Sequence, residues 1–154
     1  MSEVLKQYFN NVQSSDIAHY SYSDSSLQNF LTMEEDKEFD WVITNPPFKL
    51  AEDFIQKSLK IATIGVAMLV RTVFIESIGR YERLFTRSKP TSFSQYAERV
   101  PMLKGRLDRS ASTATGYGWI VWNKQMKNNN TELRWIPPLR KKLEKDEDYI
   151  IKPK

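Results

Sequence analysis

Apolar residues recur at helical spacing in three parts of the chain, namely residues 4–9, 51–62 and 78–88. In the middle segment, apolar positions three and four residues apart form one face, as in an amphipathic helix. The serine-rich segment 21–28, SYSDSSLQ, shows no such period and is predicted to be a loop. The pattern therefore predicts three helices, with a polar loop between the first and the second.

Short apolar runs between these helices predict strands at residues 11–17, 39–44 and 65–74. The run FDWVIT at 39–44 has adjacent apolar residues, which is typical of a strand buried on both faces. Two later segments, 92–100 and 117–124, are expected to pair antiparallel. Because strands alternate with helices, the chain is predicted to have an α/β fold, with a mixed edge where the last two strands pair.

Residues 43–49 read ITNPPFK, so two adjacent prolines directly follow the predicted strand. Each proline fixes its own φ and lacks an N–H, and neither can extend a sheet or enter a helix interior. Each also pushes the preceding residue toward extended geometry, which constrains Asn45 and Pro46. The prolines can simply end the strand. Alternatively, they hold functional groups at its carboxyl end, where ligands bind in α/β sheets.

The groups at this proline elbow match a planar ligand that carries an amino group. The Asn45 side-chain oxygen and the Pro46 carbonyl are two acceptors at a fixed separation, and an exocyclic –NH2 offers two hydrogens. Phe48 adds an aromatic face on which a base can stack for about 1–3 kcal/mol. Accepting both hydrogens makes the nitrogen more nucleophilic and holds it for attack. A methyl group on a sulfonium centre is the electrophile that suits such a nitrogen.

The sequence Asn45-Pro46-Pro47-Phe48, set between a strand and an amphipathic helix, resembles the catalytic motif of the amino-group S-adenosylmethionine-dependent methyltransferases. Within that superfamily the chain is similar to the adenine-N6 DNA methyltransferases, particularly small phage-type ones. The resemblance covers roughly residues 1–125 and implies a Rossmann-like methyltransferase sheet, mostly parallel with an antiparallel edge strand. Residues 126–154 are then a polar C-terminal extension.

The resemblance implies S-adenosylmethionine as the cofactor. Asp16, followed by Ile17, takes the place of the family's acidic residue that binds the ribose hydroxyls, although a loop or helix-capping aspartate fits the position too. In QNFL, Asn29 precedes Phe30 where the family has an aspartate that contacts the adenine amino group, and an amide gives a weaker contact. All five glycines follow the elbow, so the family's first strand and its Gly-rich cofactor loop are expected to be missing.

Composition narrows the class of protein without deciding its activity. The chain has 154 residues, 40% hydrophobic and 12% aromatic, which favours a folded domain. It has no cysteine, which excludes disulfides and thiol nucleophiles, and with His19 as the single histidine no metal site is expected. No apolar stretch approaches the roughly 18 residues of a membrane span, and the N-terminus does not resemble a secretion signal. A cytoplasmic protein without a membrane partner is expected.

Basic residues are the candidates for nucleic-acid contact. The net charge of +4 leans weakly toward a polyanionic partner. Most of the candidates fall in or beside the loop between the last two predicted strands, where they could bind phosphates. The alternative is a surface loop that contacts only solvent, which has the same composition. The candidate phosphate ligands are Lys49, Arg99, Lys104, Arg106 and Arg109, with Arg71 and Arg80 less well placed.

DNA is the expected partner, with RNA as an alternative. The elbow equally suits enzymes that methylate RNA bases or a protein glutamine, because an amide –NH2 also has two hydrogens. The absent Gly-rich loop instead favours impaired methyl transfer, or a non-catalytic nucleic-acid-binding remnant. A missing central strand would also expose two sheet edges, which favours self-association.

Overall fold

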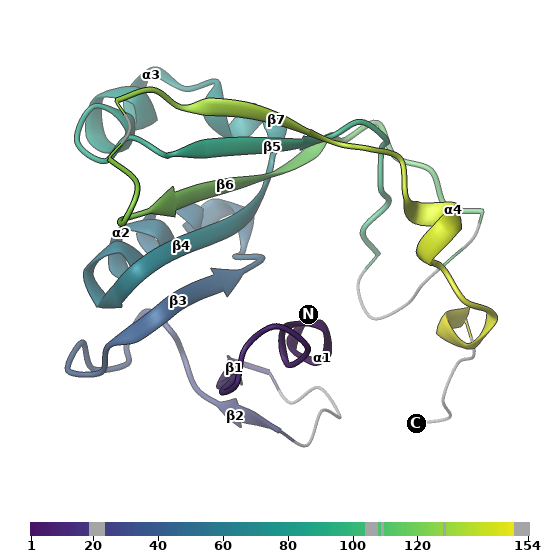
Figure 1. Ribbon diagram of the computed structural model, residues 1–154, viewed down its shortest axis with the longest axis horizontal. Coiled ribbons are helices and arrows are strands. Elements are labelled where there is room, and N and C mark those ends of the chain that lie inside the picture. Colours follow the sequence, from purple (N-terminus) through teal and green to yellow (C-terminus); the bar gives the residue numbers. More distant parts are fainter. Residues whose placement is uncertain (19–23, 104–107, 109, 128, 150–154) are drawn as a thin grey trace.

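The computed structural model describes residues 1–18, 24–103, 108, 110–127 and 129–149. In this part of the chain, strands form a five-stranded sheet in the order β3-β4-β6-β5-β7 and a separate two-stranded sheet, β1-β2 (Figure 1). The strands are β1 (Ser14–Asp16), β2 (Ser25–Leu27), β3 (Phe39–Thr44), β4 (Ala62–Arg71), β5 (Ser92–Tyr96), β6 (Tyr117–Asn123) and β7 (Glu132–Ile136). The helices are α1 (Ser2–Leu5), α2 (Ala51–Ile61), α3 (Ile78–Arg80) and α4 (Arg140–Leu143). The protein therefore has a mixed α/β fold.

The five-stranded sheet is mixed. β3 is parallel to β4, β6 is antiparallel to both β4 and β5, and β7 is parallel to β5. The predicted antiparallel pairing of β5 with β6 is confirmed, but the prediction of a mostly parallel sheet with an antiparallel edge strand is wrong. β6 lies inside the sheet because it is apolar on both faces. Ile120 and Trp122 are buried on one face, and Trp119 and Val121 are half-buried on the other.

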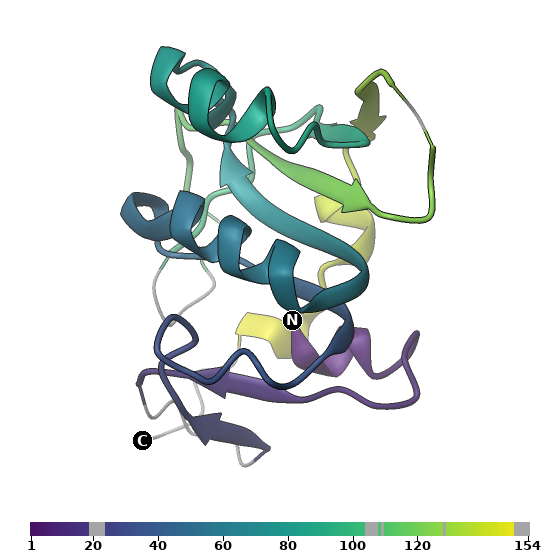
Figure 2. The ribbon, with the colours of Figure 1, turned by 90° about the vertical axis from the view of Figure 1, so that its left-hand side faces the viewer.

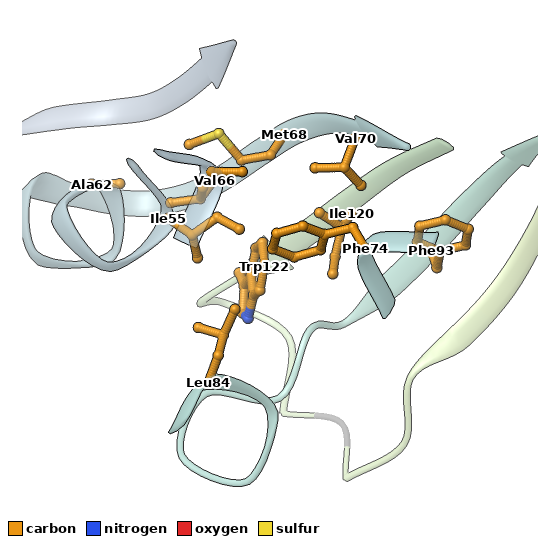
Figure 3. Packing of buried hydrophobic residues seen from close by; sticks show 11 residues of the cluster. Ile55, Ala62, Val66, Met68, Val70, Phe74, Leu84, Phe93, Ile120 and Trp122 are labelled. Atoms are coloured by element: carbon orange, nitrogen blue, oxygen red, sulfur yellow. The ribbon is translucent and has the colours of Figure 1, made fainter. Parts of the chain in front are cut away.

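The core lies where α2 and the segment after β4 meet one face of this sheet. α2 packs on β4, and Ile55 of α2 is fully buried. Figure 3 shows Leu84, which follows α3, pointing toward Trp122 of β6. The buried cluster comprises Ala51, Ile55, Ala62, Val66, Met68, Val70, Phe74, Leu84, Phe93, Ile120 and Trp122. This packing holds β3, β4 and β6 in a fixed arrangement, which in turn positions the elbow at the end of β3.

The two-stranded sheet lies below the five-stranded sheet, on the side of β3 (Figures 1 and 2). β1 and β2 pair in parallel. The chain after β2 is attached to α2, because the Phe30 ring stacks on Phe54 with centroids 4.9 Å apart. Lys57, which is 7% exposed, also donates hydrogen bonds to the carbonyls of Leu31 and Met33. These contacts fix the end of β2 relative to α2 and the elbow.

Several local predictions differ from the structure. β2 falls within the segment 21–28 that was predicted to be a loop, because backbone pairing with β1 stabilises a strand whose side chains are mostly exposed. The helix predicted over 78–88 is the short α3 followed by a π-helical turn at Tyr81–Phe85. The polar segment after residue 125 contributes β7 to the main sheet. No helix in the described ranges is long and apolar enough to cross a membrane.

Candidate active site at the end of β3

The proline elbow links β3 to α2. Asn45, Pro46 and Pro47 directly follow β3, and Phe48 begins a 3₁₀ turn, Phe48–Leu50, that leads into α2. Pro47 precedes this turn with φ −54° and ψ 126°, and its carbonyl accepts a hydrogen bond of 2.8 Å from the Leu50 N–H. Pro46 is buried, whereas Asn45 is exposed. The elbow therefore presents Asn45 to solvent on a rigid, partly buried support.

Two hydrogen-bond acceptors at the elbow have no partner within the described protein. Within the described residues, neither the Asn45 side-chain amide nor the Pro46 carbonyl is hydrogen-bonded to a protein group. The two groups are adjacent along the backbone, and the proline rings restrict the rotation between them. The backbone that carries both acceptors is therefore stiff and would lose little entropy on binding a ligand.

Phe48 contacts the ends of β4 and β6. The guanidinium carbon of Arg71 lies 4.1 Å from the centroid of the Phe48 ring, which is a cation–π geometry. The Tyr117 ring is tilted by 35° to the Phe48 ring, with centroids 6.1 Å apart. Arg71 and Tyr117 lie opposite each other in the β4–β6 ladder, so the ladder brings both to the elbow. Arg71 thus covers one face of the ring that was predicted to stack on a base.

Sequence reasoning gave Arg71 little weight and did not name Tyr117. A signal for Arg71 exists, since it is the first charged residue after the apolar run of β4 and so marks the carboxyl end of that strand. No comparable local signal marks Tyr117, because its position depends on the pairing of β4 with β6.

The predicted cofactor residues lie together at the end of the two-stranded sheet. One Asp16 carboxylate oxygen accepts a hydrogen bond of 2.9 Å from the Ala18 N–H, and the Asn29 side-chain oxygen accepts one of 3.0 Å from the Leu31 N–H. Both side chains therefore stabilise local turns. The N–H of the residue before Asn29 donates to the Asp16 carbonyl at 2.9 Å, so the two turns are neighbours. Ile17, next to Asp16, is 69% exposed.

Two grooves lie between the small sheet with its flanking residues and β3. One has a volume of about 350 Å³ and is lined from one side by β1, β2 and Phe30, and from the other by Trp41 and Asn45. The other, of about 760 Å³, is lined by residues before β1 and by residues 37–41 and 43. Asn45 and Phe30 thus face the same groove, which brings the elbow and part of the predicted cofactor side together. Asp16, Ile17 and Asn29 lie outside the lining of this groove.

The predicted nucleic-acid ligands are only partly placed. Lys49 is exposed in the turn that begins with Phe48. Arg99 is exposed and lines a third groove, of about 520 Å³, together with Trp135 and Thr72. Thr72 directly follows Arg71, which lies over the Phe48 ring, so one end of this groove is near the elbow. The remaining candidates, Lys104, Arg106 and Arg109, lie outside the described residues.

Neither a cluster of metal ligands nor a match to a known protein gives further evidence about this site. Among the residues described by the structure, no group of three His, Cys, Asp or Glu side chains could hold a metal ion. No family model matches the chain, and no curated protein matches it in sequence. Any functional assignment therefore depends on the residues of the elbow and their geometry.

Proposed function

We propose that the chain has a Rossmann-like methyltransferase fold and that the elbow transfers a methyl group from S-adenosylmethionine to adenine N6 in DNA. One observation carries this proposal: the Asn45 amide and the Pro46 carbonyl are unpartnered acceptors, held by a proline backbone beside the Phe48 ring. An amino group on a planar base uses all three features at once. If the two prolines only ended the strand, the Asn45 and Pro46 oxygens would not need to be left without hydrogen-bond partners.

The arrangement of the two sheets supports the proposed fold. Within the described residues β3 pairs with β4 alone and β1 with β2 alone, so each has one unpaired edge. The grooves of about 350 Å³ and 760 Å³ lie in the region between these strands. A further strand at this place would join the two sheets into one. This agrees with a methyltransferase sheet in which one central strand is not formed by the described residues.

The residues around the smaller groove fit the adenosine end of the cofactor. Its volume of about 350 Å³ lies in the range of small-molecule sites, about 300–1,000 Å³. Asp16 does not line the groove but directly follows Ser15, which does. One Asp16 carboxylate oxygen is used in its turn, and the other has no protein partner in the described chain and can accept from a ribose hydroxyl that extends beyond the groove. Phe30 gives the groove an aromatic face. When bound, S-adenosylmethionine supplies an electrophilic methyl group on a positively charged sulfur.

Asn45 and Pro46 act on the target amine. Their oxygens accept its two N–H hydrogens, which raises the electron density on nitrogen and orients it for attack. Transfer of the methyl group would break its bond to sulfur, with the electron pair leaving on S-adenosylhomocysteine, and the methylated amine would then give up one proton to solvent, so the site needs no strong base. Phe48 stacks on the target base. Because Arg71 covers one face of the ring, the base takes the other face or displaces the guanidinium.

Methyl transfer by the Asn45→Ala variant tests the proposal. The purified chain is incubated with labelled S-adenosylmethionine and adenine-containing duplex DNA, and label is expected on adenine N6. Asn45→Ala removes one of two preorganised contacts and should lower kcat about 10²–10³-fold. Because Asn45 is exposed, the unfolding temperature should stay the same. Asn129→Ala, which changes an exposed asparagine in the turn before β7, is the control and should keep full activity.

Calorimetric titration with S-adenosylhomocysteine separates the possible failures. Binding without transfer to DNA, but with transfer to RNA or to a glutamine peptide, would refute the assigned substrate. No binding by a chain that unfolds cooperatively would refute the cofactor assignment. Full activity of the Asn45→Ala variant would refute the role of Asn45.

A further inference from the structure

β7 presents an open edge of the main sheet. It is the last strand in the order β3-β4-β6-β5-β7, and it lies at the upper edge of the sheet in Figure 1. In the described chain it pairs with β5 alone. Leu133 is 58% exposed and Trp135 is 66% exposed, although both are large apolar residues in a strand. An exposed edge of this kind is a template for pairing with another strand.

The backbone of β7 shows which residues can pair outward. The Glu132 N–H donates to the Thr91 carbonyl at 2.9 Å, and the Ile136 carbonyl accepts from the Ala97 N–H at 2.9 Å. Both groups therefore point toward β5. Because backbone groups alternate in direction along a strand, the N–H and C=O groups of Leu133 and Trp135 point to the open edge.

The side chains of β7 divide between the two faces of the sheet. Leu133 and Trp135 lie on one face, in register with Phe93 and Gln95 of β5. Glu132 and Arg134 lie on the opposite face, where they form an ion pair of 2.6 Å. The pattern along the edge is thus one acid and one base on one face and two apolar side chains on the other.

We propose that β7 is a self-association site, at which a second copy of this chain pairs antiparallel about a two-fold axis through Leu133. In this register Leu133 faces Leu133 of the second copy, and their outward N–H and C=O groups exchange hydrogen bonds. Glu132 lies opposite Arg134 of the second copy, and the symmetry repeats this pair on the other side of the axis. Opposite charges directly across two strands stabilise the pairing.

Charge complementarity selects this register over the others. An axis through Glu132 or through Arg134 places like charges directly opposite each other, and so does a parallel, in-register pairing. An axis through Trp135 places Pro137 opposite Leu133, where an N–H is needed that proline lacks. The axis through Leu133 avoids both faults, which is why the occupant is a second copy in one register rather than any extended strand. This proposal does not depend on the methyltransferase assignment.

Sedimentation equilibrium over a concentration series tests the proposal with two charge variants. Glu132→Arg makes both charged positions basic, and Arg134→Glu makes both acidic, so each variant alone places like charges opposite each other. We expect each to raise the dimer dissociation constant at least about tenfold. Mixed in equal amounts, the two variants regain opposite charges in both pairs and should form a heterodimer of near wild-type affinity.

The mixing result also controls for folding, because variants that had failed to fold could not pair on mixing. Lys37→Glu alters the net charge by the same amount as Arg134→Glu, but Lys37 lies just before β3, at the edge of the sheet opposite β7, and this variant should dimerise like the wild type. A wild-type chain that stays monomeric throughout the series overturns the proposal. So do single variants that dimerise like the wild type, or a mixture that stays monomeric.

Discussion

Gly65 of β4 lies directly against the Trp41 ring, and replacing it by alanine probes how tightly β3, β4 and β6 pack. A Cβ atom at Gly65 would lie 2.4 Å and 2.5 Å from two ring carbons of Trp41 and 2.8 Å from the Trp122 carbonyl oxygen. The half-buried Trp41 side chain can turn away toward the grooves, but the Trp122 carbonyl moves only with the backbone of β6. Alanine therefore has to displace both a side chain and a strand.

Overpacking of this kind costs about 1–3 kcal/mol. In a domain of this size each kcal/mol lowers the unfolding temperature by about 2–4 °C, so Gly65→Ala should lower it by about 2–12 °C. Urea unfolding followed by circular dichroism gives the change in free energy of unfolding, and calorimetry gives the temperature. The larger losses of stability and of unfolding temperature are expected if the Trp41 ring cannot move away from Gly65.

Gly79→Ala is the matched control. A Cβ there meets the exposed guanidinium of Arg83, the nearest atom at 2.7 Å, so this group has to shift and weaken its surface hydrogen bonds to Glu52. Alanine in α3 offsets this loss by up to about 1 kcal/mol over glycine. We expect Gly79→Ala to be neutral or slightly stabilising. If Gly65→Ala were as stable as Gly79→Ala, the close packing of Trp41 on β4 would be wrong.

Two further predictions concern charged residues. Arg71→Ala should lower the slope of log K for DNA binding against log salt by about 0.7–0.9, because the exposed guanidinium beside Phe48 can contact one phosphate, and Arg71→Lys should keep the slope. If the slope is unchanged in the alanine variant, Arg71 of the wild type contacts no phosphate and stays on Phe48 in the complex. Hydrogen bonds of 2.9 Å from Arg83 hold the pKa of Glu52 below its ordinary value, so their stabilisation is present at neutral pH and is lost as the pH falls through that lowered pKa. The unfolding temperature should therefore fall more between about pH 7 and about pH 3 for the wild type than for Glu52→Gln, and equal falls would contradict the assignment.

Of the elements with a strong local pattern, β3 and α2 were predicted correctly, whereas the helix predicted over 78–88 is the short α3 followed by a π-helical turn. β3 and α2 agree with their apolar patterns, and the prolines between them define the boundary on sequence alone. β2 and β7 were missed because their stability comes from backbone pairing with β1 and β5, and most of their side chains are exposed. The position of β6 inside the sheet depends on pairing between distant segments, which the order of residues does not reveal.

The same division applies to the candidate site. Asn45 to Phe48 could be located from the sequence because proline fixes local geometry. The contact of Phe48 with Arg71 and Tyr117 could not, because it requires the β4–β6 ladder to bring residues from two distant segments together. Asp16 and Asn29 lie in neighbouring turns; a loop or capping role was one of the two interpretations of Asp16, whereas the turn at Asn29 was not predicted.

Three of the four tryptophans occupy environments so different that the protein carries its own optical probes. Trp41 lines both grooves beside β3, whereas Trp135 stands exposed on β7 and Trp122 is buried in the core. A ligand entering the grooves should change the emission of Trp41, and pairing of β7 should shift that of Trp135. Single Trp→Phe replacements at these two positions would separate the signals, so groove binding and self-association could be followed in one titration without an attached label.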